Sequence, residues 1–323
     1  MVKFNFLINS LGAKIVRNGN LNQTSWFVFL AFFICVITLG PGCFSKEHYE
    51  PKKQEKPLTH ESKNWQKKHP EWIFSDDFES VAPVVNQARY FEYNDNSGDF
   101  VPTNSVGVNS SRGMRVKWEK GEVEAGNLKL GFGRVPDAYM DKGIRNTENF
   151  REVYYRMYMK MGEGWEGNPY KHSRATVFSG SDWSQAMIAH IWQNATDGLA
   201  MDPASGTDAA GNVVTQGYND FANLTWLGAK SGTTPIFSSE NAGKWFCIEV
   251  HVKLNDPGQS NGIQEFWING VLQAKSNNLN FTKTYTEYGI NAIFFENYWN
   301  SGSLKNQERY IDNIVVSTKR IGF

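Results

Sequence analysis

The stretch Trp245–Leu254 (WFCIEVHVKL) decides the fold of this chain. Side chains of a β-strand point alternately to opposite faces, and every second residue here is apolar. The apolar positions are Phe246, Ile248, Val250, Val252 and Leu254, and the intervening positions are Trp245, Cys247, Glu249, His251 and Lys253. The pattern predicts a strand with one face in a core. We interpret the ionisable face as the lining of a wet groove; a plain solvent-facing strand is the alternative.

Neighbouring segments repeat this alternation. Glu152–Met161 (EVYYRMYMKM) places Val, Tyr and Met on one face, and Gln264–Leu272 contains Asn269-Gly270, a strong signal for a tight β-hairpin. Further strands are predicted at Arg174–Phe178, Ala186–Trp192, Asn291–Tyr298 and Tyr310–Ser317. Long helical periodicity is lacking, so we predict an all-β antiparallel β-sandwich, a concanavalin A-like jelly roll with a concave groove.

The N-terminal region predicts export. Trp26–Leu39 is apolar and uncharged but shorter than the roughly 20 residues that span a bilayer, which is typical of a signal peptide. Gly42-Cys43 resembles the end of a bacterial lipobox, which predicts lipidation of Cys43; an ordinary secretory signal or an uncleaved anchor are alternatives. The predicted organisation is a signal segment 1–43, a flexible charged tether 44–72 and a jelly-roll domain 73–323.

The amino-acid composition limits the classes of molecule that this chain is expected to bind. The chain has 33 basic and 33 acidic residues, which argues against nucleic acid as the main partner. The 11 Trp and 13 Tyr residues offer flat apolar faces that suit sugar rings, although a β-rich core also favours aromatics. Cys247 is the only cysteine of the predicted domain, so no disulfide can form within it. We expect a monomer that is exported as an outer-membrane or cell-surface lipoprotein, or otherwise is periplasmic or secreted.

Two short segments carry candidate chemistry. In a strand His172 and Arg174 point to the same side, and His190 could face them from the next strand. Such a group can bind an anion and transfer protons. In Glu296-Asn297-Tyr298-Trp299 the glutamate and tyrosine share one face, where the phenol can act as acid or base. Nucleotide-binding, zinc-protease and serine-hydrolase motifs do not occur.

Several of these segments together resemble the polysaccharide-lyase-like jelly rolls, a family that includes glucuronan lyase and a fungal cellulose-induced secreted protein. The resemblance covers roughly Ile73 to Phe323. The segments that carry it are Ser173–Ala175, Gln185–Trp192, Trp245–Asn255, Phe295–Gly302 and Tyr310–Ser317. It implies a concave groove in which an acidic polysaccharide is cleaved by β-elimination at a 4-linked uronic acid. A non-catalytic carbohydrate-binding surface lipoprotein and a structural surface lipoprotein are the alternatives.

The resemblance also implies roles for residues. Arg174 with His172 would neutralise the uronate carboxylate, and His190 or Tyr298 would supply the base and the acid. A tyrosine ordinarily titrates near 10, so Tyr298 needs a nearby cation if it is the base. The expected substrate-binding residues are Lys171, Trp192, Glu249, His251, Glu296 and Trp299.

A structural calcium that joins the first and last strands is a further implication of the resemblance. Glu79 and Asp312 match the positions where carboxylates would serve, with Asn109 and Ser110 as loop contributors. Hard oxygen ligands of this kind suit Ca²⁺. The alternative is pairing of the two terminal strands without a metal.

Overall fold

The computed structural model describes residues 64–80 and 89–323, all within the compact unit Gln54–Phe323. The predicted signal segment 1–43, including Cys43, lies outside the described residues, as does the predicted tether up to residue 63. Within the described ranges no helix is both long and apolar enough to cross a membrane.

The last residues of the predicted tether are structured, which corrects the sequence prediction for them. Trp65–Lys68 form the short helix α1, and Trp72 begins strand β1. Trp72 is buried and stacks on His69, with 4.1 Å between the ring centroids. Aromatic packing therefore orders this segment against the domain.

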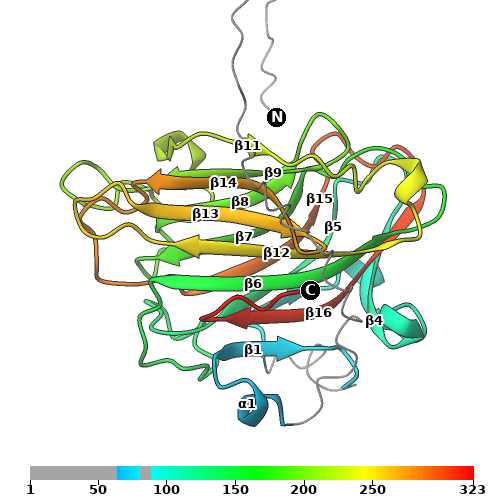
Figure 1. Ribbon diagram of the computed structural model, residues 1–323, viewed down its shortest axis with the longest axis horizontal. Coiled ribbons are helices and arrows are strands. Elements are labelled where there is room, and N and C mark those ends of the chain that lie inside the picture. The colour runs from blue at the N-terminus through cyan, green and yellow to red at the C-terminus, as the bar shows by residue number, and fades with distance from the viewer. Residues whose placement is uncertain (1–63, 81–88) are drawn as a thin grey trace, which may run out of the picture. The chain divides into compact units, whose positions relative to one another are not determined.

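The domain consists of two antiparallel sheets packed face to face (Figure 1), which confirms the predicted antiparallel sandwich. Sheet A has the order β14-β13-β12-β6-β16-β4-β3, and β1 also pairs with β16. Its strands are β1 (Trp72–Asp76), β3 (Phe100–Thr103), β4 (Gly113–Trp118), β6 (Glu152–Met161), β12 (Trp245–Lys253), β13 (Gly262–Ile268), β14 (Val271–Leu279) and β16 (Gln307–Ser317).

Sheet B has the order β10-β9-β8-β7-β15-β5-β2, and β11 also pairs with β9. Its strands are β2 (Glu92–Asn94), β5 (Glu124–Gly131), β7 (Lys171–Phe178), β8 (Gln185–Gln193), β9 (Leu199–Ser205), β10 (Thr225–Trp226), β11 (Lys230–Ser231) and β15 (Ala292–Tyr298). Single 3-10 turns occur at η1 (Asn96–Gly98), η2 (Val108–Ser110), η3 (Phe221–Asn223) and η4 (Ser239–Asn241).

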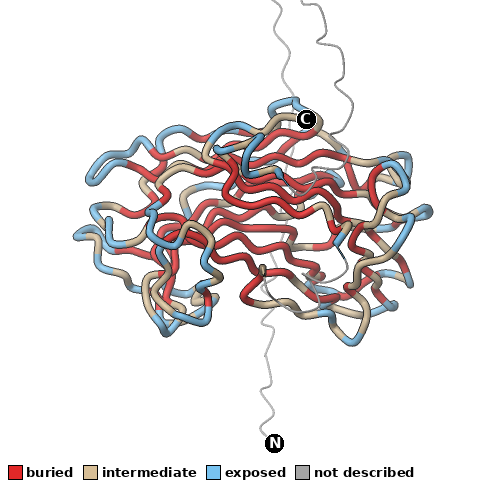
Figure 2. Tube along the Cα trace, turned by 90° about the horizontal axis from the view of Figure 1, so that it is seen from below, coloured by how far each residue is buried: buried red, intermediate tan, exposed pale blue. Residues whose placement is uncertain are grey.

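The core lies between the two sheets, as the alternation predicts. The apolar face of β12 packs there with Tyr155, Met157 and Met159 of β6, and Figure 2 shows buried chain through both layers with exposed residues mostly in loops. The predicted hairpin joins β13 to β14 through Asn269 and Gly270, both with positive φ, as a tight two-residue turn requires. Cys247 is buried without a disulfide, so burial of apolar surface provides much of the stability.

Two β-bulges interrupt neighbouring strands of sheet B, one in β7 at Lys171–Ser173 and one in β15 at Glu296–Tyr298. The buried Arg309 of β16 lies behind them and donates hydrogen bonds to the Glu296 carbonyl (2.7 Å) and to Asn297 Oδ1 (2.5 Å). Bulges re-aim side chains at the point where they occur. Here they bring Lys171 and Tyr298 opposite each other in the ladder.

Candidate active site

A pocket of about 230 Å³ opens on the face of sheet B that points away from the core. Side chains of β2, β5, β15 and β7 line it, together with Tyr218 and Asn219 from the loop before η3. Glu296 and Tyr298 both line the pocket, so the prediction that they share a face is confirmed. Lys171 lines it beside them, and its Nζ lies 4.4 Å from the centroid of the Tyr298 ring.

Lys171 differs from the other cations of this face in having no carboxylate within ion-pair distance among the described residues. Lys129 is paired with Glu92, and Arg174 is paired with Glu296 at 3.0 Å. Burial lowers the pKa of Lys171, and the positive charge of Arg174 adds to this effect against the opposing influence of Glu296. An unpaired, partly desolvated amine is suited to contact an anion or to accept a proton.

Arg174 lies on the outer face of sheet B, but it is only 1% exposed and does not line the pocket. Besides Glu296, its guanidinium donates hydrogen bonds to Asn219 Oδ1 and to the Tyr218 hydroxyl. All three acceptors line the pocket. Arg174 therefore orients residues that line the pocket and does not itself face the pocket.

His190 pairs directly opposite Arg174, as predicted, on the same outer face. It is buried among aromatic rings outside the pocket, and burial with the nearby Arg174 charge lowers its pKa well below the usual range, so it is neutral. Its Nδ1 lies 3.2 Å from the Asp202 carbonyl, which can only accept a hydrogen bond. The proton therefore resides on Nδ1, and Nε2 carries a lone pair.

His172 faces the core, which corrects the prediction that it shares a side with Arg174. The β7 bulge breaks the alternation at this residue. The imidazole stacks on Phe237 and accepts a hydrogen bond on Nδ1 from Arg309 at 2.8 Å. Burial and the Arg309 charge hold its pKa well below the usual range. His172 therefore contributes to the interior of the sandwich and not to the pocket.

Three predicted substrate-binding residues also lie elsewhere. Glu249 and His251 occupy the outer face of sheet A. There Glu249 accepts a hydrogen bond from the backbone of Ile321, and His251 is hydrogen-bonded to Glu152. Trp299 is 3% exposed and packs in the core against Trp118 and Trp165. Trp192, also expected to bind substrate, lies on the outer face of sheet B beside His190 and does not line the pocket.

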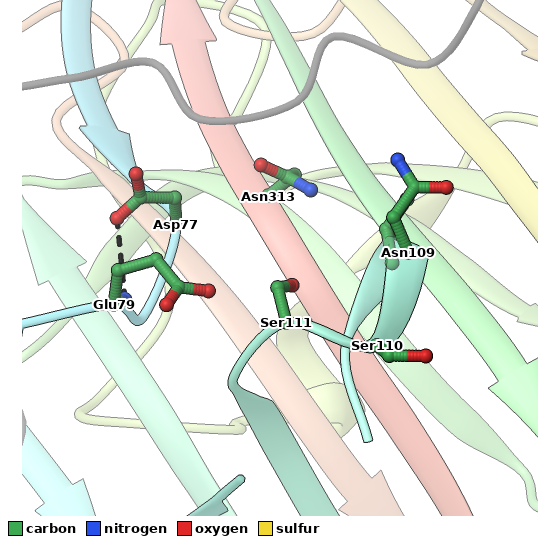
Figure 3. A pocket seen from close by; sticks show the side chains of 7 residues that line it. Asp77, Glu79, Asn109, Ser110, Ser111 and Asn313 are labelled. Carbon is green, nitrogen blue, oxygen red and sulfur yellow. Dashed lines mark hydrogen bonds between the residues drawn. The ribbon is translucent and has the colours of Figure 1, made fainter. Parts of the chain in front are cut away.

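A second pocket, of about 440 Å³, lies where β1 ends beside the middle of β16, near η2. Glu79, Asn109 and Ser110 line it as predicted, joined by Asp77 and Asn313. Figure 3 shows Asp77 and Glu79 on one side and the turn that carries Asn109 and Ser110 on the other, with Asn313 between them. Among described residues no set of three His, Cys, Asp or Glu side chains could hold a metal. Two carboxylates with amide and hydroxyl oxygens nonetheless form a hard donor set of the kind Ca²⁺ accepts.

Asp312 does not line this pocket, contrary to the prediction. Its carboxylate is buried and accepts hydrogen bonds from the backbone N–H groups of Val108 (2.7 Å) and Asn313 (2.7 Å). Burial, with the neighbouring charges of Glu79 and Asp77, raises its pKa to about 7. The charges of Asp77 and Glu79 therefore act on Asp312, although its carboxylate is held by backbone N–H groups and does not line the pocket.

The sequence prediction missed several lining residues. Asn127 and Lys129 of β5 alternate with the core residues Leu128 and Leu130, a period-two signal that was available in the sequence. Tyr218 and Asn219 come from a loop without periodicity, so only the folded chain places them at the pocket.

The two antiparallel sheets form a jelly-roll β-sandwich, as the sequence predicted, with a pocket on the outer face of one sheet. A profile of the polysaccharide lyase 14 family matches residues 236–307, which include Tyr298. Among curated proteins no sequence matches the chain.

Solved structures with the same fold include alginate lyase from Chlorella virus, the marine PL-14 alginate lyase from Aplysia kurodai and endo-β-1,4-glucuronan lyase from the fungus Trichoderma reesei. Their sequence identities to this chain are 12%, 12% and 14%, and the TM-scores are 0.53, 0.54 and 0.51. Each alignment covers 77% of this chain and, in the same order, 100%, 99% and 96% of the other chain. This likeness concerns the fold.

Proposed function

We propose that the domain is a polysaccharide lyase that cleaves a uronic-acid-containing polymer by β-elimination in the pocket of sheet B. The observation that carries the proposal is the position of Lys171, which has no ion-pair partner in the described part of the chain, beside Tyr298 in that pocket. The match to a polysaccharide lyase profile supports the same reaction class.

β-Elimination removes the C5 proton of the uronate, breaks the C4–O4 bond and forms a C4–C5 double bond. Lys171 is the base in this proposal, because its lowered pKa increases the neutral fraction of the amine. Tyr298 is the acid: its phenol gives a proton to the departing O4 oxygen, which leaves as a hydroxyl group. The protonated Lys171 then returns its proton to Tyr298 or to solvent.

The uronate carboxylate gains negative charge as the C5 proton leaves, so a donor must face it. Asn219 is oriented for this task, because its Oδ1 accepts a hydrogen bond from Arg174 and its NH₂ group therefore points away from the guanidinium. Asn127 and Lys129 line the same pocket as further donors. Arg174 acts on the carboxylate through Asn219 in this arrangement.

The test incubates the protein with glucuronan, alginate, pectate and ulvan and follows the ultraviolet absorbance of the unsaturated product. Wild type should release product from at least one polymer, and Lys171→Ala should bind that polymer without releasing product. If wild type binds a polymer and forms no product from any of them, the domain is a carbohydrate-binding module instead.

We also propose that Ca²⁺ binds the pocket lined by Asp77, Glu79 and Asn313 and stabilises the junction of β1 with β16. When bound, the ion would supply positive charge beside Asp77 and Glu79, whose charges also act on Asp312. A ligand that binds only the folded state adds about 2.7 kcal/mol at a free concentration about a hundredfold above Kd. Thermal unfolding with added Ca²⁺ or EDTA tests this role.

A further inference from the structure

A cluster of aromatic side chains lies beside Lys171 on the outer face of sheet B, next to the pocket that the proposed reaction uses but outside its lining. Trp192 of β8, Phe221 of η3 and Trp226 of β10 form it, and we call these three residues the aromatic platform. Their ring centroids lie 5.7 to 6.4 Å apart. Trp226 is 41% exposed, so a large apolar ring faces solvent on this sheet.

The platform surrounds polar atoms that have no partner. The ring of His190 lies within contact of all three platform residues, and its Nε2 is buried without a hydrogen bond. Because Nδ1 carries the proton, this Nε2 is an acceptor. Trp192 Nε1, a donor, is likewise buried without a partner. A buried polar atom without a partner is costly, so an internal water or a small side-chain movement would stabilise this place, and the surface that a ligand meets consists of the aromatic rings.

The platform continues the proposed catalytic pocket. Lys171 Nζ lies 5.6 Å from the centroid of the Phe221 ring on one side and 4.4 Å from that of Tyr298 on the other. A polymer whose reacting sugar contacts Lys171 and Tyr298 would place a neighbouring sugar over the platform. The buried His190 beneath the platform is neutral, so it offers a sugar bound there no countercharge.

We propose that the aromatic platform is a sugar-binding subsite that stacks on a pyranose ring with equatorial substituents, which makes D-glucuronate the favoured neighbour of the scissile bond. This inference rests on the proposed function. An all-equatorial ring presents axial C–H groups on both faces, and these pack flat on an indole ring. Guluronate carries axial substituents that hold the ring away from such a surface.

The experiment measures the affinity of oligoglucuronate and oligoguluronate by titration calorimetry in a Lys171→Ala background, which prevents turnover. Adding Trp226→Ala should weaken oligoglucuronate binding about tenfold, whereas Trp226→Phe should retain most of the affinity. Val271→Ala, an exposed apolar position on β14 of the other sheet, is the matched control and should change nothing. If Trp226→Ala does not fold, Phe221→Ala serves in its place.

The outcomes separate the subsite from the reaction. Unchanged oligoglucuronate affinity in Trp226→Ala would overturn the subsite even if wild type forms unsaturated product. Equal, Trp226-dependent binding of oligoguluronate would overturn the preference for equatorial substituents. If binding depends on Trp226 but wild type forms no product, the subsite holds and the lyase proposal fails.

Discussion

The outer faces of the two sheets carry similar ionisable residues, but these residues differ in their hydrogen-bond and ion-pair partners. On sheet A, Glu249 accepts the backbone N–H groups of Ile321 and Gly322, and His251 lies between Glu152 and Glu265 at 2.8 Å from each. On sheet B, Lys171 borders a pocket and has no ion-pair partner in residues 64–80 and 89–323. Ionisable side chains alone therefore do not define a site; groups left without a partner beside a cavity do.

Two lysines make the comparison concrete. Lys160 of sheet A resembles Lys171 in that burial lowers its pKa and its Nζ lies over two aromatic rings, those of Trp245 and Tyr310. Of these two lysines, Lys171 lines the pocket of sheet B and Lys160 does not. Both lysines are thus partly buried against aromatic rings, and the pocket beside Lys171 is what distinguishes it from Lys160.

The largest expected effect separates these two lysines. Lys171→Ala should lower kcat by about 10²–10⁴-fold, because it removes the proposed base. Lys160→Ala should leave kcat unchanged. Steady-state rates of product formation from the preferred polymer provide the comparison. Equal rates for the two variants would show that Lys171 has no special role.

A second pair tests the proposed acid. Tyr298→Phe keeps the ring that packs on Lys171 but removes the hydroxyl, so kcat should fall by about 10²-fold while KM changes little. Tyr310→Phe, on the outer face of sheet A, is the control and should behave as wild type. A rise in KM alone for Tyr298→Phe would assign the phenol to binding.

The pH dependence should follow the base. Only the neutral amine of Lys171 accepts a proton, so kcat/KM should increase with pH as the amine deprotonates. Burial lowers its pKa, which moves this increase to lower pH than for an ordinary lysine. A pH–rate profile measures it, and a rate that declines steadily from neutral to alkaline pH would contradict the assignment.

Calcium removal should give the smallest effect, on stability rather than chemistry. Burial raises the pKa of Asp312 from 3.8 to about 7, so ionising this group costs free energy in the folded state. Protein treated with EDTA should therefore lose stability as pH rises from about 4 through about 7 and should level off above. Calcium should reduce that loss. Melting temperatures that are the same with Ca²⁺ and with EDTA at every pH would exclude the site.

The sequence predicted the fold well because its signal is local. The alternation in Glu152–Met161 and Trp245–Leu254 is enough to assign both strands and their core faces. Glu296 and Tyr298 were placed on one face for the same reason, and both line the pocket.

The errors arose where distant parts of the chain decide the structure. His172 was assigned to the wrong side because its orientation depends on a bulge and on Arg309, 137 residues away. Glu249 and His251 were assigned to the correct face of their strand, but periodicity does not reveal which sheet bears the pocket. The same limit applies to Asn219, which reaches the site from a loop.

The position of a bound oligouronate tests the central claim most directly. A crystal structure of the Lys171→Ala variant with an oligouronate should show the sugar chain across β15 and β7 on the outer face of sheet B, with one uronate beside Tyr298 and Asn219. An oligosaccharide bound instead over Glu249 and His251 on sheet A would contradict the assignment of the active face.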